Sequence, residues 1–201
     1  MIDEIRSSPL NVAVAAFRAY EAQDWARIAT LADEVSLASF REQQLLMARA
    51  MAQHPSVMPT DATPHVHPAV IEFFDSISQL QQISSLSGFA RVSSLDELEA
   101  LTPRELFTRY LEGHAPDPRN YEDGRGPIAR RTVIGSVAES DVLTHVVYRI
   151  TTDVGRYGIT EEMSVLSCTK RDDMWSVSLN GDLSSTGSGG TARITNLESL
   201  P

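Results

Sequence analysis

Apolar residues recur at helical spacing in the first part of the chain. Ser8-Pro9 is typical of a helix start, because a hydroxyl caps the first turn and proline suits the first helical position. The stripe that follows is Leu10, Ala13, Val14, Phe17 and Tyr20. Asp24 predicts a second helix start, and a third helical pattern covers about residues 38–53. The N-terminal part is therefore predicted to be helical.

The middle of the chain combines loops with further helices. Residues 54–68 hold four prolines and little periodicity, which predicts a loop, and a helical apolar stripe runs from Val66 to Leu80. Two capping boxes follow, in which a hydroxyl caps a backbone amide and a glutamate three residues later reaches back. They begin at Ser94 and at Thr102, and the second helix is expected to end near Gly113.

The hydrophobic period then changes from helical to alternating. Four stretches rich in Val, Ile, Thr and Tyr read as strands: 130–138, 142–151, 159–169 and 174–181. Their short connections predict an antiparallel meander. Helices followed by such a sheet indicate an α+β fold, with the N-terminal helices packed on the sheet.

These patterns also suggest how the chain is organised. We expect a single α+β domain over 1–183, with a mostly helical insertion at about 54–127. Residues 184–201 are rich in Ser, Gly and Thr, which predicts a flexible tail.

Composition narrows the classes of partner and compartment. The chain has 201 residues and a formal net charge of −10, which argues against nucleic acid and against anionic membrane surfaces as partners. No apolar run is long enough to cross a membrane, and the N-terminus lacks a signal-peptide pattern. The single cysteine, Cys168, excludes a disulfide within the chain. A cytoplasmic location is expected.

No local motif marks a cofactor or a metal. Phosphate-loop and dinucleotide-binding patterns are absent from the sequence, so no cofactor is expected. His65 and His67, with His54 nearby, have metal-like spacing, but a proline-rich loop is a poor scaffold for zinc. We expect no metal site there.

Strand alternation sorts the sheet residues into two faces. The more apolar set is expected to pack on the helices: Val142, Thr144, Val146, Tyr148, Ile150, Ile159, Glu161, Met163, Val165, Trp175, Val177 and Leu179. Tyr148 and Glu161 are its polar exceptions. A carboxyl on an apolar wall has a raised pKa and can act as an acid or base, and Tyr20 and Asp33 from the helices are placed to join it. The alternative is that Glu161 lies in solvent near a strand end and that Tyr148 is a core residue.

The opposite face is mixed in character. It is expected to carry His145, Arg149, Glu162, Leu166 and Cys168. Such a face on an antiparallel sheet is either solvated or a dimer contact. His145 is a candidate general base, because its pKa lies near neutrality, or simply a half-exposed histidine.

Both ends of the chain resemble the nuclear transport factor 2-like superfamily, which includes SnoaL-like cyclases and ketosteroid-isomerase-like enzymes. At the N-terminal end, residues 12–24 read as a helix running into a short turn. Residues 142–149 and 163–177 read as long strands, with a polar turn and then Trp175. The resemblance implies a curved, cone-like sheet around helices, a pocket and frequent dimerisation. It does not imply one function, since members include enzymes, binding modules and scaffolds.

Three functions remain open at this point. The first is binding of a small apolar molecule in the cone, with Tyr20, Tyr148, Glu161 and Trp175 as candidate ligand-binding residues. The second is an isomerase, cyclase or dehydratase, in which Glu161, Asp33 or His145 moves a proton and Tyr148 or Tyr20 stabilises an oxyanion. The third is a non-catalytic interaction module that forms a homodimer through the sheet.

Overall fold

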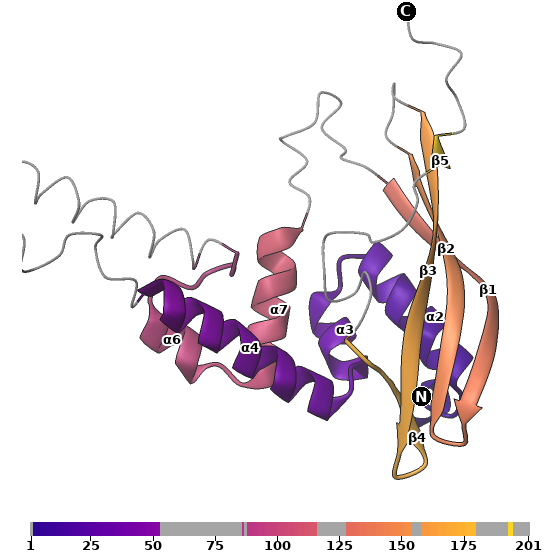
Figure 1. Ribbon diagram of the computed structural model, residues 1–201, viewed down its shortest axis with the longest axis horizontal. Coiled ribbons are helices and arrows are strands. Elements are labelled where there is room, and N and C mark those ends of the chain that lie inside the picture. The colour runs from indigo at the N-terminus through magenta and orange to yellow at the C-terminus, as the bar shows by residue number, and fades with distance from the viewer. Residues whose placement is uncertain are drawn as a thin grey trace, which may run out of the picture. The chain divides into compact units, whose positions relative to one another are not determined.

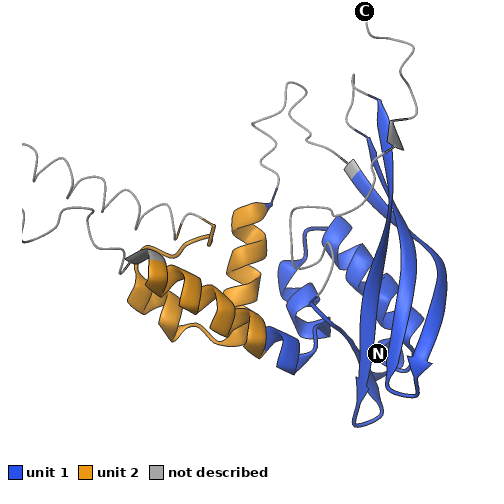
Figure 2. Cartoon of the chain, in the orientation of Figure 1, with its two compact units in different colours: residues 1–37, 115–201 blue, residues 38–114 orange. Residues whose placement is uncertain are grey.

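The computed structural model describes residues 2–52, 86, 88–115, 128–153, 158–179 and 193–194. They form helices and an antiparallel sheet, so the α+β prediction is confirmed (Figure 1). The chain divides into two compact units, unit 1 with residues 1–37 and 115–201 and unit 2 with residues 38–114 (Figure 2). The expected single domain over 1–183, with its insertion and tail, stays a prediction.

The helices of unit 1 begin at side-chain caps that the sequence indicated. They are α1 (Ile2–Ile5), α2 (Pro9–Glu21) and α3 (Trp25–Leu31), and α4 (Glu34–Ala52) begins in unit 1 and continues into unit 2. The Ser8 hydroxyl accepts a hydrogen bond from the Asn11 amide at 3.1 Å, and the Asp24 carboxylate accepts one from the Arg27 amide at 3.0 Å. Both predicted helix starts are therefore confirmed.

The third helix begins earlier than residue 38, where the sequence pattern placed its start. The Asp33 carboxylate accepts a hydrogen bond from the Ser36 amide at 2.9 Å and so caps α4. The apolar stripe alone did not reveal this cap, because the first turn of α4 carries the exposed residues Glu34 and Val35.

The sheet belongs to unit 1 and is a meander, as predicted. Its strands β1 (Ile128–Ser140), β2 (Leu143–Asp153), β3 (Ile159–Arg171) and β4 (Met174–Val177) pair antiparallel in that order. The last strand ends before the expected residue 181. A two-residue strand, β5 (Arg193–Ile194), pairs with β3 from within the stretch predicted as a tail.

The register of β2 on β3 corrects the predicted faces. Residues directly opposite in an antiparallel pair share a face. Tyr148 opposes Ser164 and Ile150 opposes Glu162, so Glu161 lies on the other face from Tyr148. The prediction that Ile159, Met163 and Val165 share the face of Tyr148 was wrong for the same reason, as was the placement of Glu162, Leu166 and Cys168 on the opposite face. Trp175 and Val177 of β4 do share the face of Tyr148, as predicted.

We call the face that packs on α2 the inner face and the opposite one the outer face. The inner face includes Val146, Tyr148, Ile150, Leu166, Cys168, Trp175 and Val177, and all of them are buried. Helix α2 covers it with Val12, Ala13, Ala16 and Phe17, which are also buried. The rings of Phe17 and Tyr148 lie 4.5 Å apart between their centroids. This packing is the core of unit 1.

In unit 2 both predicted helix starts are present, before α6 (Leu95–Ala100) and α7 (Pro103–His114), and the reciprocal bonds of a capping box are formed before α7. The Thr102 amide donates to the Glu105 carboxylate at 2.9 Å, and the Glu105 amide donates to the Thr102 hydroxyl at 3.3 Å. Before α6 the carboxylate of Glu97 accepts instead from the amide and hydroxyl of Ser93, the residue before the cap. These hydrogen bonds lower the pKa of Glu97 and of Glu105.

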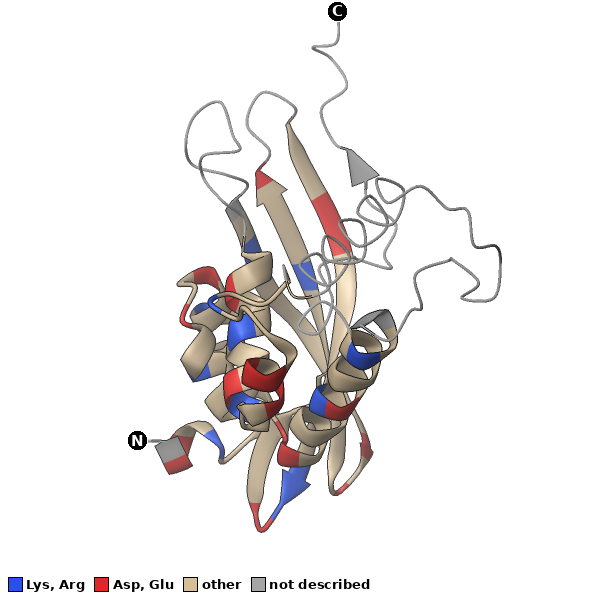
Figure 3. Cartoon of the chain, turned by 90° about the vertical axis from the view of Figure 1, so that its left-hand side faces the viewer, with Lys and Arg blue, Asp and Glu red and all other residues tan. Residues whose placement is uncertain are grey.

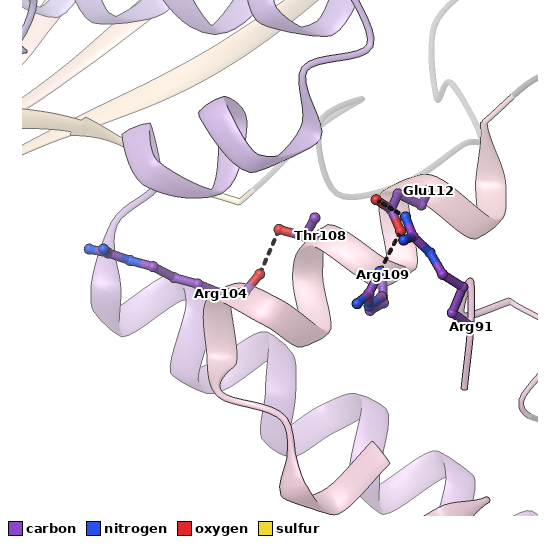
Figure 4. A network of polar contacts seen from close by, with 5 residues as sticks. All are labelled: Arg91, Arg104, Thr108, Arg109 and Glu112. Atoms are coloured by element: carbon purple, nitrogen blue, oxygen red, sulfur yellow. Dashed lines mark hydrogen bonds and ion pairs between the residues drawn. The ribbon is translucent and has the colours of Figure 1, made fainter. Parts of the chain in front are cut away.

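Aromatic side chains and arginines hold the rest of unit 2 together. Phe40 packs edge-to-face on Phe107 and on Tyr110, and burial raises the pKa of Tyr110. The Glu112 carboxylate pairs with Arg91 at 2.9 Å and with Arg109 at 3.0 Å, next to a helical bond from the Thr108 hydroxyl to the Arg104 carbonyl (Figure 4). The predicted helix between Val66 and Leu80 lies outside the described residues.

Candidate functional site

The four candidate ligand-binding residues do not lie together. Tyr148 and Trp175 share the inner face, and Tyr148 is fully buried against Phe17. Tyr20, at the end of α2, stacks under the guanidinium of Arg131, 4.0 Å from its ring centroid. Glu161 lies on the outer face. The inner-face side chains that the sequence proposed for a ligand are thus part of the core of unit 1.

One polar atom in that core stands out. The Tyr148 hydroxyl is buried and has no hydrogen-bond partner within the described part of the chain. Leaving a buried hydroxyl unsatisfied costs about 1–3 kcal/mol. A water molecule or a ligand acceptor would remove that cost.

The three catalytic candidates are also distributed over different places. Asp33 is buried and caps α4, where its carboxylate also accepts from the Ser36 hydroxyl at 3.1 Å. Glu161 lies on the outer face, 3.7 Å from the Arg149 guanidinium. His145 is on the outer face as well, with different partners.

His145 is the centre of a hydrogen-bonded chain across three strands. Its Nε2 lies 2.7 Å from the carboxylate of Glu139 on β1, and its Nδ1 lies 2.9 Å from the hydroxyl of Ser167 on β3. Because a carboxylate only accepts hydrogen bonds, Nε2 carries a proton, and in the neutral ring Nδ1 accepts from the serine hydroxyl. This order, acid to histidine to serine, is the one in which a serine nucleophile is activated.

These three hydrogen-bonded residues nevertheless fit a positioning role better than a nucleophilic one. Ser167 is only 6% exposed, so its hydroxyl is poorly presented to a substrate. What the arrangement does is hold the imidazole between the Glu139 carboxylate and the Ser167 hydroxyl. Sequence reasoning missed Glu139 and Ser167, because the pairing of His145 with Ser167 follows only from the register of β2 on β3.

Large apolar side chains are exposed around the hydrogen-bonded residues Glu139, His145 and Ser167. On the outer face Val137, Met163 and Val165 are 61%, 48% and 43% exposed. Ile134, at the bulge of β1, is exposed too, and a Cβ at Gly135 would meet only open space. Exposed apolar residues that gather on one side of a sheet mark an interaction surface rather than a solvated one.

The charged residues of the outer face are balanced. The register places Arg130, Arg149 and Arg171 on this face, with Asp153 and Glu161 and with the Glu139 that reaches His145. These three arginines and three carboxylates of β1, β2 and β3 balance each other, whereas the whole chain has a formal net charge of −10. On the helices that Figure 3 brings to the front, acidic and basic residues are likewise interspersed.

The described residues also bear on metal binding, on the reactivity of Cys168 and on membrane spans. Among them, no group of three or more His, Cys, Asp and Glu side chains is placed to hold a metal ion, and His54, His65 and His67 lie outside them. Burial raises the pKa of the Cys168 thiol to about 12, which makes it unreactive. In the described part of the chain, no helix has the length and apolar character to span a membrane.

Comparison with known proteins adds no relative: no family model, no curated protein and no solved structure matches the chain. The resemblance to the nuclear transport factor 2-like superfamily stays a prediction.

Proposed function

We propose that this chain is a non-catalytic interaction module that pairs with a second copy of itself through the outer face of its sheet. The observation that carries the proposal is the exposed apolar group formed by Val137, Met163 and Val165, on the face of the sheet opposite to the buried Val146, Tyr148 and Leu166. Burying such side chains against a partner is favourable by about 25 cal/mol per Å² of apolar surface.

A second copy suits this face better than an unrelated acidic or basic partner. A twofold axis brings the same patch against itself, so the patch has to be self-complementary. The outer face meets that requirement, because Arg149 and Glu161 lie 3.7 Å apart and can exchange partners across the axis. Its balanced charge also avoids the repulsion that the net charge of −10 would otherwise produce.

The size of the face is close to that of a standard interface. Three long strands at about 4.8 Å spacing and about 3.3 Å per residue span roughly 14 by 40 Å. With side-chain relief and β4, this area approaches the roughly 800 Å² per partner of a standard interface. The superfamily that the sequence resembles dimerises frequently, which points the same way.

Sedimentation equilibrium tests the proposal. The unchanged chain is expected to be a dimer, and Val165→Glu is expected to be a monomer at the same concentrations, because each copy would have to bury a carboxylate in the interface. Leu46→Glu is the matched control, since Leu46 is 68% exposed on the part of α4 that belongs to unit 2, and it should leave the dimer intact. A monomeric wild-type chain over a wide concentration range, or equal loss in both variants, would contradict the proposal.

A second candidate function is binding of a small apolar molecule on the inner face. It is favoured by one observation, the buried Tyr148 hydroxyl without a partner, which could donate to a ligand acceptor. Native mass spectrometry of the purified chain tests it: a co-purified small molecule that is lost in Tyr148→Phe supports it. Identical masses for the two proteins, apart from the oxygen atom, count against it.

A further inference from the structure

A groove lies along α2 on the side away from the sheet. Its volume is about 680 Å³, and residues of α1, α2 and α3 line it. Its floor consists of Leu10, Val14, Ala15, Ala19 and Ala22. Since Val12, Ala13, Ala16 and Phe17 of the same helix face the sheet, the groove and the inner face occupy opposite sides of α2.

The hollow follows from the sequence of α2. Residues 15, 19 and 22 fall on one side of a helix on successive turns, and all three are alanine. Leu10, 41% exposed, and Val14 extend this side with larger apolar groups. The result is a trough between α1 and α3 with an apolar row along part of its floor, of a volume typical of small-molecule sites, about 300–1,000 Å³.

Two arginines line the trough. Arg18 on α2 and Arg27 on α3 both belong to it, and their guanidinium groups make no hydrogen bond or ion pair with the described residues. Other arginines of the chain are engaged, such as Arg41 with two carbonyl groups and Arg49 with Glu99. Unengaged guanidinium groups beside an apolar trough are suited to a carboxylate, which they bind through paired hydrogen bonds.

The lining holds as many carboxylates as arginines. Asp24 caps α3 through the Arg27 amide at 3.0 Å, and Glu4 on α1 is the other carboxylate. The lining is therefore formally neutral, and what the two guanidinium groups offer an anionic head group is their unused hydrogen-bond donors.

From this geometry we infer that the groove of α1, α2 and α3 binds a single-chain amphiphile with a carboxylate head. The alkyl chain lies on the alanine floor, and the carboxylate lies between Arg18 and Arg27. Because the groove is on the far side of α2 from the sheet, a dimer through the outer face would leave both grooves open. The inference therefore does not depend on the proposed function.

Isothermal titration calorimetry with sodium decanoate, below its micelle concentration, tests this site. Saturable binding with one site per chain is expected. Arg18→Gln together with Arg27→Gln should weaken it by about tenfold or more, since a hydrogen bond to a charged group contributes about 1.5–3 kcal/mol. The double variant Arg49→Gln and Arg91→Gln has the same change of charge on exposed arginines elsewhere and should bind as the wild type does.

Two further measurements separate the site from unspecific adsorption. Ala15→Phe fills the floor and should abolish binding, with circular dichroism checking that the variant folds; if it does not fold, the arginine variants decide. Decyltrimethylammonium has the same alkyl chain length and the opposite charge, and it should not bind.

The inference is overturned by absent or unsaturable decanoate binding, by equal binding of the cationic amphiphile, or by equal loss in the control double variant. Preferential sedimentation with phosphatidylglycerol vesicles would also overturn it, because the surface would then be a membrane contact.

Discussion

The two faces of the sheet are made by the same strands but differ in how deeply their side chains are buried. On the inner face Val146 and Leu166 are fully buried under α2, whereas their neighbours Val165 and Val137 on the outer face are about half exposed. Both faces are thus apolar, but within the described residues of unit 1 only the inner one has a helix packed on it. A sheet apolar on both sides is usual where both sides are covered.

Polar groups separate the two faces less sharply than burial does. On the outer face Glu139, His145 and Ser167 are joined by hydrogen bonds and Arg149 pairs with Glu161, but the buried Thr169 hydroxyl has no partner in the described part of the chain. On the inner face the same is true of the Tyr148 hydroxyl. The inner face is thus built for packing, while the outer face pairs its charged groups and leaves its apolar groups exposed.

The largest expected effect separates the two faces by stability. Leu166→Ala on the inner face should lower the free energy of unfolding by about 2–5 kcal/mol, because it leaves a cavity under α2. Val165→Ala, its neighbour on the outer face, should change it by no more than about 0.5 kcal/mol at concentrations where the chain is monomeric. Urea unfolding followed by circular dichroism measures both. Equal losses would mean that the faces are equally buried, and the comparison would fail.

Thiol chemistry gives a second measure of how closed the inner face is. Burial raises the pKa of Cys168 from 9.0 to about 12, so at pH 8 its thiolate is about 1,000-fold less populated than that of an ordinary cysteine. Reaction with Ellman's reagent should be slower by at least about this factor in the native chain than in guanidinium chloride. A native rate near the denatured one would show that the face opens readily.

Removing the Tyr148 hydroxyl tests the polar half of the comparison. Tyr148→Phe keeps the ring against Phe17 and deletes a buried group without a partner in the described residues. The free energy of unfolding should therefore rise by about 1 kcal/mol. Phe17→Leu is the control for ring packing and should lower it. A loss of more than about 1 kcal/mol in Tyr148→Phe would mean that water, a ligand or another part of the chain satisfies the hydroxyl.

Local signals in the sequence predicted local structure well. The caps at Ser8, Asp24 and Thr102 each depend on residues within three positions, and the structure has all three hydrogen bonds. The strands and their meander order were predictable for a similar reason, since the connections are short.

The faces of β3 and the site were not predictable, for a physical reason. Both alternating sets of β3 are apolar in part, with Met163 and Val165 in one and Leu166 and Cys168 in the other, so alternation alone cannot select a face. Only the register with β2 decides, and it places Glu161 on the outer face. The chain of Glu139, His145 and Ser167 has no local signature, because 22 residues separate the histidine from the serine.

The smallest expected effect lies in the β3–β4 turn, which belongs to neither face. Asp172 and Asp173 have φ of 50° and 62°, as a type I′ turn requires, and glycine adopts such angles at lower cost than aspartate. Asp172→Gly should therefore raise the free energy of unfolding by a few tenths to about 1 kcal/mol. Asp173→Gly should raise it less, because it also removes the 2.9 Å contact with Lys170 that lowers the pKa of Asp173. Thermal unfolding of both variants, with sedimentation equilibrium, checks this. If Asp172→Gly instead altered self-association, the turn would have to belong to the outer face, and the division of the sheet into two faces would need revision.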